Sequence, residues 1–111
     1  MAEVPKDAEQ KIAQLQLMEQ NLQSFLMQRQ QFQSQLIEVE SALKEIETSN
    51  ETYKIVGNIM VNASKDELKK DLEEKKKVLE LRIKSLEKQE KQIKEKATKT
   101  QAEVLEKMKG K

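Results

Sequence analysis

The feature that most constrains the fold is a seven-residue repeat of apolar side chains in the first half of the chain. Its members follow one another at spacings of three and four residues, which places them in one stripe along a helix. The stripe consists of Ala8, Leu15, Met18, Leu22, Phe25, Phe32, Leu36, Val39, Leu43 and Ile46, and Lys11 and Arg29 interrupt it. This pattern predicts a long coiled-coil helix, placed at residues 4–49, that needs a second helix to cover its stripe.

Residues with clear positional preferences mark the ends of this helix. Pro5 suits a first helical turn, where its missing N–H is not needed, and Asp7 and Glu9 supply the negative charge that a helix N-terminus favours. The Thr-Ser-Asn run at 48–50 favours a turn over a helix interior. We therefore expect the helix to start near Val4.

A second and weaker repeat predicts another helix at residues 65–109. It is preceded by Ser64-Lys65-Asp66-Glu67, which has the spacing of a capping box that satisfies free backbone N–H groups in the first turn. Its apolar members are Leu72, Leu79, Ile83, Leu86, Ile93, Ala97 and Val104, and its polar members are Lys76, Glu90 and Thr100. Gly110 marks the predicted stop.

Two arms of similar length predict an antiparallel coiled-coil hairpin. Residues whose numbers sum to about 115 should then face each other, so that Leu43 lies near Leu72 and Phe25 near Glu90. Residues 1–50 carry four basic and eight acidic side chains, net −4, whereas residues 65–111 carry sixteen and eleven, net +5, so the arms attract each other. The seam becomes more polar toward the free ends, which we expect to fray.

Composition excludes several classes of function. Hydrophobic residues make up 36% of the chain and charged residues 37%, so a seam is expected in place of a thick core. The chain has no histidine and no cysteine, which removes the commonest catalytic bases, nucleophiles and metal ligands. We predict no catalytic residues, no cofactor and no metal.

The chain contains no apolar run long enough to span a bilayer, and its first residues, MAEVPKDAEQ, do not resemble a secretion signal. These two features lead us to expect a cytoplasmic protein that does not contact membranes.

Between the two arms, residues 50–64 change from helix-forming to β-branched and aromatic residues. Gly57-Asn58 accepts the positive φ of a tight turn, so the segment predicts a β-hairpin in which Tyr53, Ile55, Ile59 and Val61 share a face. A lone hairpin has unpaired edges and is marginal in water, so it needs neighbours. It either folds onto the root of its own coiled coil or, as we favour, pairs with strands of other chains. The predicted assembly residues are Tyr53, Ile55, Val56, Gly57, Ile59, Met60 and Val61.

The run Tyr-Lys-Ile-Val-Gly-Asn-Ile-Met-Val at 53–61, flanked by two heptad arms, resembles the prefoldin beta subunits of archaeal type. The resemblance continues through Leu72-Glu-Glu-Lys, Leu79-Glu-Leu-Arg-Ile and Ser85-Leu-Glu-Lys-Gln-Glu, and it covers nearly the whole chain. Alpha-type subunits of that family have two hairpins between their arms, whereas this sequence has room for one. The beta type is therefore the better match.

The resemblance implies a mainly α chain that assembles with an alpha-type subunit. It implies a hexamer of two alpha and four beta subunits, in which the hairpins form a β-barrel platform and the coiled coils extend from it. In that family the distal ends of the arms hold unfolded polypeptides without ATP and pass them to a group II chaperonin.

Apolar residues in the outer half of the arms are the candidate client-binding residues. Some lie off the predicted seam, and fraying would expose others that belong to it. The set is Ile12, Leu15, Leu17, Met18, Leu22, Val104, Leu105 and Met108. Scattered exposed apolar residues are also ordinary on any surface, so each one alone is weak support.

Two other functions compete with this interpretation. The lysines of the second arm could bind nucleic acid, but Asp71, Glu73, Glu74 and Glu80 dilute their charge and that arm has no aromatic residue for base stacking. The chain could also be a structural coiled-coil spacer or tether, for which the heptads suffice but the exposed apolar residues have no role.

Overall fold

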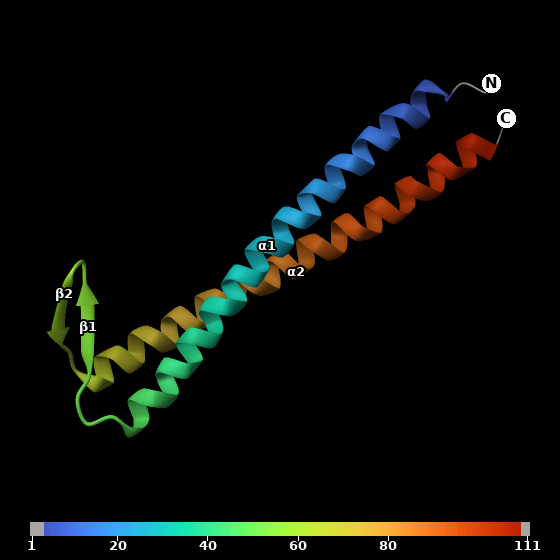
Figure 1. Ribbon diagram of the computed structural model, residues 1–111. Helices are drawn as coiled ribbons and strands as arrows, with labels where there is room; N and C mark the ends of the chain where they lie inside the picture. Colours follow the sequence, from blue (N-terminus) through green and yellow to red (C-terminus); the bar gives the residue numbers. More distant parts are fainter. Residues whose placement is uncertain (1–3, 110–111) are drawn as a thin grey trace. The chain divides into compact units, whose positions relative to one another are not determined.

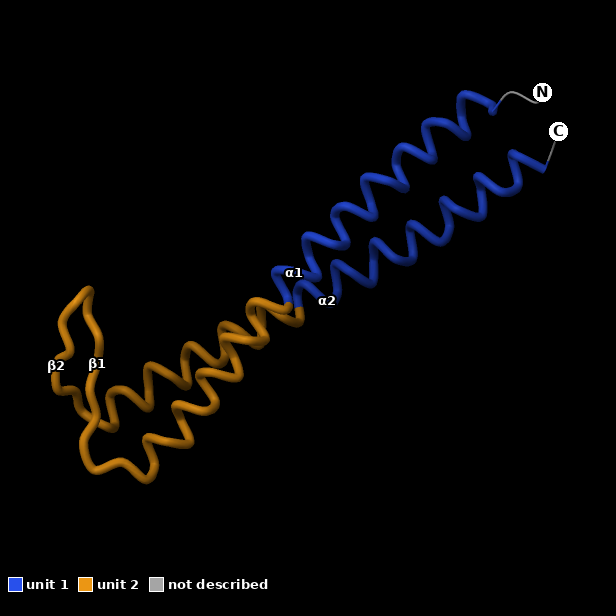
Figure 2. Tube along the Cα trace, in the orientation of Figure 1, with its two compact units in different colours: residues 1–29, 85–111 blue, residues 30–84 orange. Residues whose placement is uncertain are grey.

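The computed structural model describes residues 4–109 and contains four elements (Figure 1). Helix α1 spans Lys6–Thr48, strand β1 spans Tyr53–Val56, strand β2 spans Ile59–Asn62 and helix α2 spans Lys65–Lys109. Two long helices joined by one small antiparallel hairpin confirm the predicted fold of the single chain. The chain divides into two compact units (Figure 2). Unit 1 comprises residues up to 29 and from 85 onward, and unit 2 comprises residues 30–84.

Helix α1 begins at Lys6, two residues later than the predicted start near Val4. The Pro5 carbonyl accepts the first helical hydrogen bond, from the Glu9 N–H at 3.0 Å, so Pro5 precedes the first turn. Val4 stands immediately before a proline, whose ring disfavours helical φ/ψ in the preceding residue. That steric effect explains the later start.

The C-terminal end of α1 has no basic residue of its own in its last turn. Instead, Lys65 of α2 donates a hydrogen bond from Nζ to the Glu47 carbonyl at 3.0 Å, and the Ser49 hydroxyl donates to the Glu45 carbonyl at 2.9 Å. These groups satisfy carbonyls that the helix itself leaves free, and the lysine adds the positive charge that a helix C-terminus favours. Helix α2 begins at Lys65, the predicted position.

In unit 1, residues 6–29 of α1 pack antiparallel against residues 85–109 of α2. The buried residues are Ala8, Leu86, Glu90, Thr100 and Val104, all of which belong to the predicted stripes. Lys11 forms an ion pair with Glu103, and Lys107 Nζ lies 3.2 Å from Asp7 Oδ2. Both pairs match the predicted antiparallel register to within one residue.

In unit 2, residues 30–48 of α1 pack against residues 65–84 of α2 through an apolar seam. Val39, Ile46, Leu79 and Ile83 are buried, and the Arg82 guanidinium lies 5.5 Å from the centre of the Phe32 ring, as a cation–π contact requires. Unit 1 buries Glu90 and Thr100 in its seam, whereas the helix seam of unit 2 buries only apolar side chains. This contrast confirms that the seam is more polar toward the chain ends.

The β-hairpin pairs Val56 with Ile59, Ile55 with Met60, Lys54 with Val61 and Tyr53 with Asn62. Gly57 in the turn has φ of 63°, a conformation that glycine adopts without strain. Directly opposed residues project to the same face and neighbours along a strand to opposite faces. The prediction that Tyr53 and Ile55 share a face with Ile59 and Val61 is therefore wrong.

The observed register gives the hairpin two differently composed faces. Tyr53, Ile55, Met60 and Asn62 lie on one face, and Lys54, Val56, Ile59 and Val61 lie on the other. The physical reason is the two-residue turn Gly57-Asn58, which makes Val56 and Ile59 directly opposed residues. Ile59 therefore shares a face with Val56 and not, as predicted, with Ile55. Each face carries three large apolar or aromatic side chains and one polar one.

Candidate functional site

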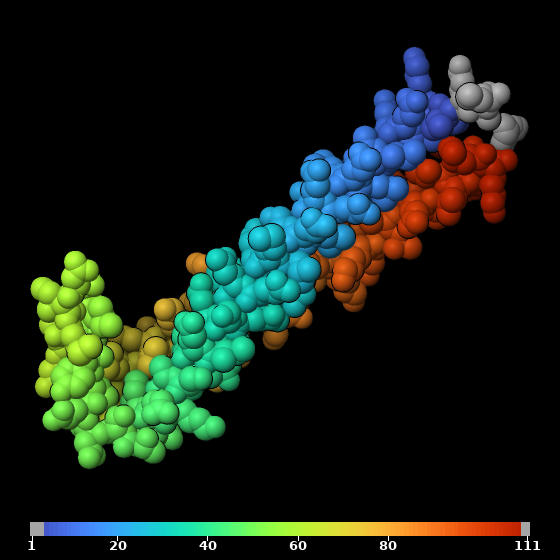
Figure 3. Space-filling view, in the orientation of Figure 1, coloured from blue at the N-terminus to red at the C-terminus, as the bar shows by residue number. Residues whose placement is uncertain are grey.

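The first candidate site is the hairpin surface, defined as Tyr53, Ile55, Val56, Ile59, Met60 and Val61. Every residue of both strands is exposed, and Ile55 and Ile59 reach 70% and 65% exposure. The face of the hairpin that is turned toward the viewer is not covered by either helix (Figure 3). Within this chain the hairpin therefore does not fold onto the root of its own coiled coil, which was the alternative to pairing between chains.

The hairpin is a two-stranded sheet, so both strands also have an unpaired outer edge. Such edges present free backbone N–H and C=O groups that can pair with a strand of another chain. Apolar side chains on two faces and hydrogen-bonding groups on two edges together suit a site that binds other strands. The six residues that define this surface are predicted assembly residues, and the seventh, Gly57, lies in the hairpin turn.

Thr52 and Ala63 hold the base of the hairpin together. The Thr52 hydroxyl donates to the Ala63 carbonyl at 2.6 Å, and the Ala63 N–H donates to the Thr52 carbonyl at 3.0 Å. Thr52 is 9% exposed, the lowest value in the segment between the helices. Sequence reasoning missed this contact, although the pairing of residues just outside the two strands follows from the hairpin register.

Tyr53 stands at the start of β1 with its hydroxyl near the hairpin base. It donates a hydrogen bond to Glu51 Oε2 at 2.7 Å, and this bond, together with slight desolvation, raises the pKa of Tyr53 above its ordinary value of 10.0. The contact links the Tyr53 side chain to the segment that joins α1 to β1.

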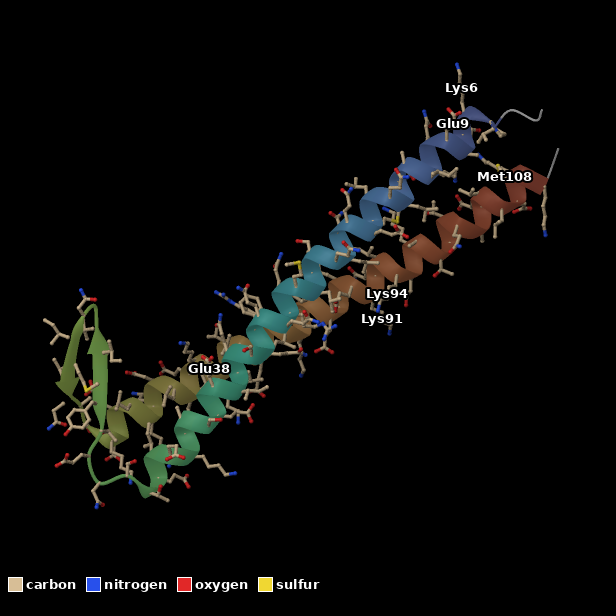
Figure 4. All side chains as sticks on the ribbon, in the orientation of Figure 1. Lys6, Glu9, Glu38, Lys91, Lys94 and Met108 are labelled. Atoms are coloured by element: carbon tan, nitrogen blue, oxygen red, sulfur yellow. The ribbon has the colours of Figure 1, made fainter. Side chains whose placement is uncertain are left out.

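The second candidate site is the outer part of the arms, where the predicted client-binding residues divide into two groups. Ile12, Leu17, Leu105 and Met108 are exposed, and Met108 lies on the side of α2 toward the first turns of α1 (Figure 4). Leu15, Met18 and Leu22 are half-buried in the seam and Val104 is buried. The first group is available to a partner at once, whereas the second becomes available only where the helices separate.

Sequence reasoning missed three exposed apolar residues in unit 2. Ile37, Val78 and Leu81 lie off the seam and are 65%, 48% and 67% exposed. Their positions outside the heptad stripes were the available signal. Leu81 lines a shallow groove with Lys77, Glu80 and Lys84, so charged side chains surround it.

A polar layer crosses the seam of unit 1 where Arg29 meets Glu90. Arg29 Nε donates to Glu90 Oε2 at 2.8 Å, and Glu90 is 7% exposed. The register predicted Phe25 near Glu90, but the long arginine side chain reaches one helical turn beyond its facing position. Arg29 and Glu90 are charged residues at apolar positions of their heptad stripes. Because they pair with each other, the seam accommodates both charges.

We expect Arg29→Leu to lower the free energy of unfolding by about 2 kcal/mol, because it leaves the Glu90 carboxylate buried without a partner. Arg29→Leu combined with Glu90→Leu should restore stability to within about 1 kcal/mol of the parent, since an apolar layer replaces the ion pair. Urea denaturation followed by circular dichroism measures both changes. A double variant as unstable as Arg29→Leu alone would contradict this account of the layer.

The Lys11–Glu103 ion pair near the chain ends predicts a dependence of stability on pH. The hydrogen bond and charge of Lys11 lower the pKa of Glu103 below its ordinary value of 4.5. A carboxylate with a lowered folded-state pKa adds stability above its unfolded pKa, and that contribution disappears as the pH falls through the folded-state pKa. The contribution is present at neutral pH and absent in strong acid.

Glu103→Gln should therefore lower the melting temperature slightly at neutral pH and leave it unchanged in strong acid. The effect is small because both side chains of the pair are partly exposed to solvent. Glu106→Gln provides a control with the same charge change on the same turn of α2. Thermal melts recorded from neutral to acidic pH test this prediction. An equal decrease in melting temperature at every pH would show that the effect does not depend on the ionisation of Glu103.

The lysines of α2 are closely mixed with carboxylates. Lys69 lies 3.9 Å from Glu47, and a surface groove contains three cations, Arg29, Lys91 and Lys94, with three carboxylates, Glu87, Glu90 and Glu95. Lys91 and Lys94 lie one turn apart on α2 (Figure 4). Such mixing gives a weaker positive potential than the continuous basic surface that nucleic-acid binding uses. Within residues 4–109, neither helix has a stretch apolar enough to cross a bilayer.

Comparison with known proteins adds an independent observation. The profile of a family described as "Prefoldin subunit" matches residues 9–111. The chain is 40% identical to "Prefoldin subunit beta" of Archaeoglobus fulgidus over 91% of this chain and 90% of that protein. It is 34% identical to the protein of the same description from Thermococcus kodakarensis, over 94% and 92% of the two chains. Its fold is similar to the crystal structure of the prefoldin beta subunit from Thermococcus strain KS-1, with a TM-score of 0.87, 36% identity and 94% coverage of both chains.

Proposed function

The chain belongs to the prefoldin family of chaperone subunits and to its beta type, and we propose that it is part of an ATP-independent holdase. Prefoldin beta subunits form hetero-oligomers with alpha subunits and work with chaperonins, and they are not enzymes. The finer proposal is that this chain captures unfolded polypeptides with the outer ends of its arms and delivers them to a group II chaperonin in the cytoplasm.

The proposed assembly contains two alpha and four beta subunits, joined through their hairpins into a β-barrel platform. The exposure of every strand residue and the unpaired edges of the two-stranded sheet are the observations that carry this proposal. A barrel pairs every edge and covers the apolar side chains on one face of each hairpin, so it reduces both features that are unfavourable in the isolated chain. Thr52 and Ala63 hold each hairpin together at the point where it leaves its helices.

The proposed client contacts are the exposed Ile12, Leu17, Leu105 and Met108, joined by Leu15, Met18, Leu22 and Val104 where the helix ends open. Flexible apolar side chains adapt to clients that have no fixed shape. Each arm has few such residues and therefore binds weakly. Several arms of one assembly together hold a client with an avidity that exceeds the affinity of each arm, and no nucleotide is needed for release.

Light scattering of a chemically denatured client, diluted into buffer without ATP, tests the proposed function. The chain mixed with its alpha-type partner should suppress aggregation, and adding ATP should not change the result. Adding a group II chaperonin should then move the client into the chaperonin fraction on sedimentation. Aggregation at the rate seen without the proteins would contradict the holdase and favour the structural spacer.

A further inference from the structure

Two of the proposed client contacts, Leu17 and Met18, line a surface groove on unit 1 whose polar side chains the proposed function does not yet use. It has a volume of about 350 Å³ and is lined by Gln14, Leu17, Met18, Asn21, Ile93 and Lys96. Leu17 is 58% exposed, and Met18 and Ile93 are seam residues that remain half-buried. Because the groove opens at Met18 and Ile93, the seam does not fully cover these two side chains. The groove floor is therefore apolar and reachable from solvent.

The polar groups around this floor are mainly side-chain amides. Gln14 and Asn21 flank Leu17 on α1, and Lys96 is the one charged residue among the six that line the groove. The surrounding stretch of α1, residues 12–28, contains six amide side chains and a single charge, Glu19. Residues 91–107 of α2, by contrast, carry eight charged side chains. The groove thus opens beside an almost uncharged part of α1.

Amide side chains match the backbone of an extended polypeptide. Glutamine and asparagine each offer both a donor and an acceptor, as does every non-proline residue of a backbone without secondary structure. A helix of a folded partner has already paired those groups internally, so it gains less from the amides. An uncharged segment also avoids the cost of desolvating a charge over Leu17, Met18 and Ile93.

We propose that this groove binds an extended, uncharged segment of an unfolded polypeptide. One apolar side chain of the segment contacts Leu17, Met18 and Ile93, while its backbone hydrogen-bonds to Gln14 and Asn21. This inference rests on the proposed holdase function and specifies both the helix surface and the client chemistry. It also places a binding site on α1 that is accessible while the helices remain paired.

Leu81 provides a matched control on the same chain. It is a leucine of similar exposure, 67%, and its groove has a similar volume of about 350 Å³, but that groove is lined by Lys77, Glu80 and Lys84. The two sites therefore share an exposed leucine but differ in its surroundings: two apolar residues, two amides and one lysine line the first groove, whereas only charged side chains line the second. If apolar exposure alone were sufficient, both sites would bind the same segment.

A photo-crosslinking amino acid placed at Leu17, at Leu81 or at Met108 of the full-length chain tests the proposal. The probe is a short synthetic peptide of leucine, serine and asparagine, together with a second peptide in which lysines replace the serines. We expect the uncharged peptide to crosslink at position 17 several-fold more than at 81 and the lysine peptide to crosslink weakly at both. In a parallel measurement, Leu17→Lys should weaken peptide binding about tenfold, while Leu81→Lys should leave it unchanged.

Three results would overturn the proposal. Equal crosslinking at positions 17 and 81 would mean that apolar exposure alone is sufficient, and crosslinks between two copies of the chain at position 17 would mean that a second copy occupies the groove. Crosslinking at position 108 without any at 17 would exclude the groove but leave the holdase intact. Loss of the holdase itself would appear separately, as no crosslinking at any position and no suppression of aggregation.

Discussion

Replacing Ile59 and Val61 with aspartate is expected to abolish assembly with the alpha-type partner, while the chain keeps its helical circular dichroism spectrum. The two residues lie on one face of β2, with Val56 opposite Ile59 and Lys54 opposite Val61. On assembly this face would be covered by neighbouring strands. An aspartate at 59 would then be buried opposite Val56 without a partner, at a cost of several kcal/mol, and the one at 61 would add a second buried charge that only Lys54 can offset. Sedimentation velocity should show only the free chain.

Lys54→Glu is the matched control, because it changes a charge on the same face at a position where the chain already has one. It should assemble, with a smaller loss of affinity than the aspartate pair, because this position already carries a charged side chain in the parent chain. Ile55→Asp with Met60→Asp tests the other face of the hairpin, and its effect relative to the first pair identifies the face that is more deeply buried. Normal assembly of the Ile59→Asp, Val61→Asp variant would show that the hairpin is not the assembly element.

The second large effect is expected from removing the ends of both arms. A chain that lacks residues 1–14 and 102–111 should still assemble but should no longer suppress client aggregation. The deletion removes Ile12, Val104, Leu105 and Met108, and it leaves Leu17 within the first turn of a newly cut helix, where fraying is expected. The hairpin lies in the other unit and keeps its contacts. Light scattering of a denatured client, with sedimentation as the assembly assay, measures both properties.

A substitution that keeps the arm length separates loss of contacts from loss of length. Ile12→Gln, Leu105→Gln and Met108→Gln together remove exposed apolar side chains and retain good helix formers. This variant should lose most of the suppression at unchanged arm length. Full suppression by either the shortened or the substituted chain would exclude the arm ends as the client-binding site.

The two helices and their seam could be predicted because heptad spacing is a local property of the sequence. Every residue that the structure buries within the helices belongs to a predicted stripe position. The error at the start of α1 was also local, since the proline effect on Val4 could have been applied at the outset. The start of α2 at Lys65 agreed with the prediction because Ser64 and the following acidic residues mark it clearly.

The hairpin was located correctly, but its faces were assigned wrongly. Counting outward from the two-residue turn places Val56 opposite Ile59 and Tyr53 opposite Asn62, so the observed register was available from the sequence. The Arg29–Glu90 pair was less accessible, because each residue interrupts its own stripe and they meet one turn away from the facing position. The exposure of Ile37 and Leu81 was also available from the sequence, because both residues lie outside the heptad stripes. The strands that we propose to pair with the hairpin belong to other chains, so the sequence of one chain cannot identify them.

Sedimentation of a labelled unfolded client, mixed with this chain and its alpha-type partner in the absence of ATP, tests the central claim most directly. If the chain is a holdase subunit that assembles through its hairpin, the label should sediment with the hetero-oligomer. It should be absent from that fraction when Ile59→Asp, Val61→Asp replaces the parent chain. A hetero-oligomer that forms normally while the client aggregates or sediments apart from it would contradict the account.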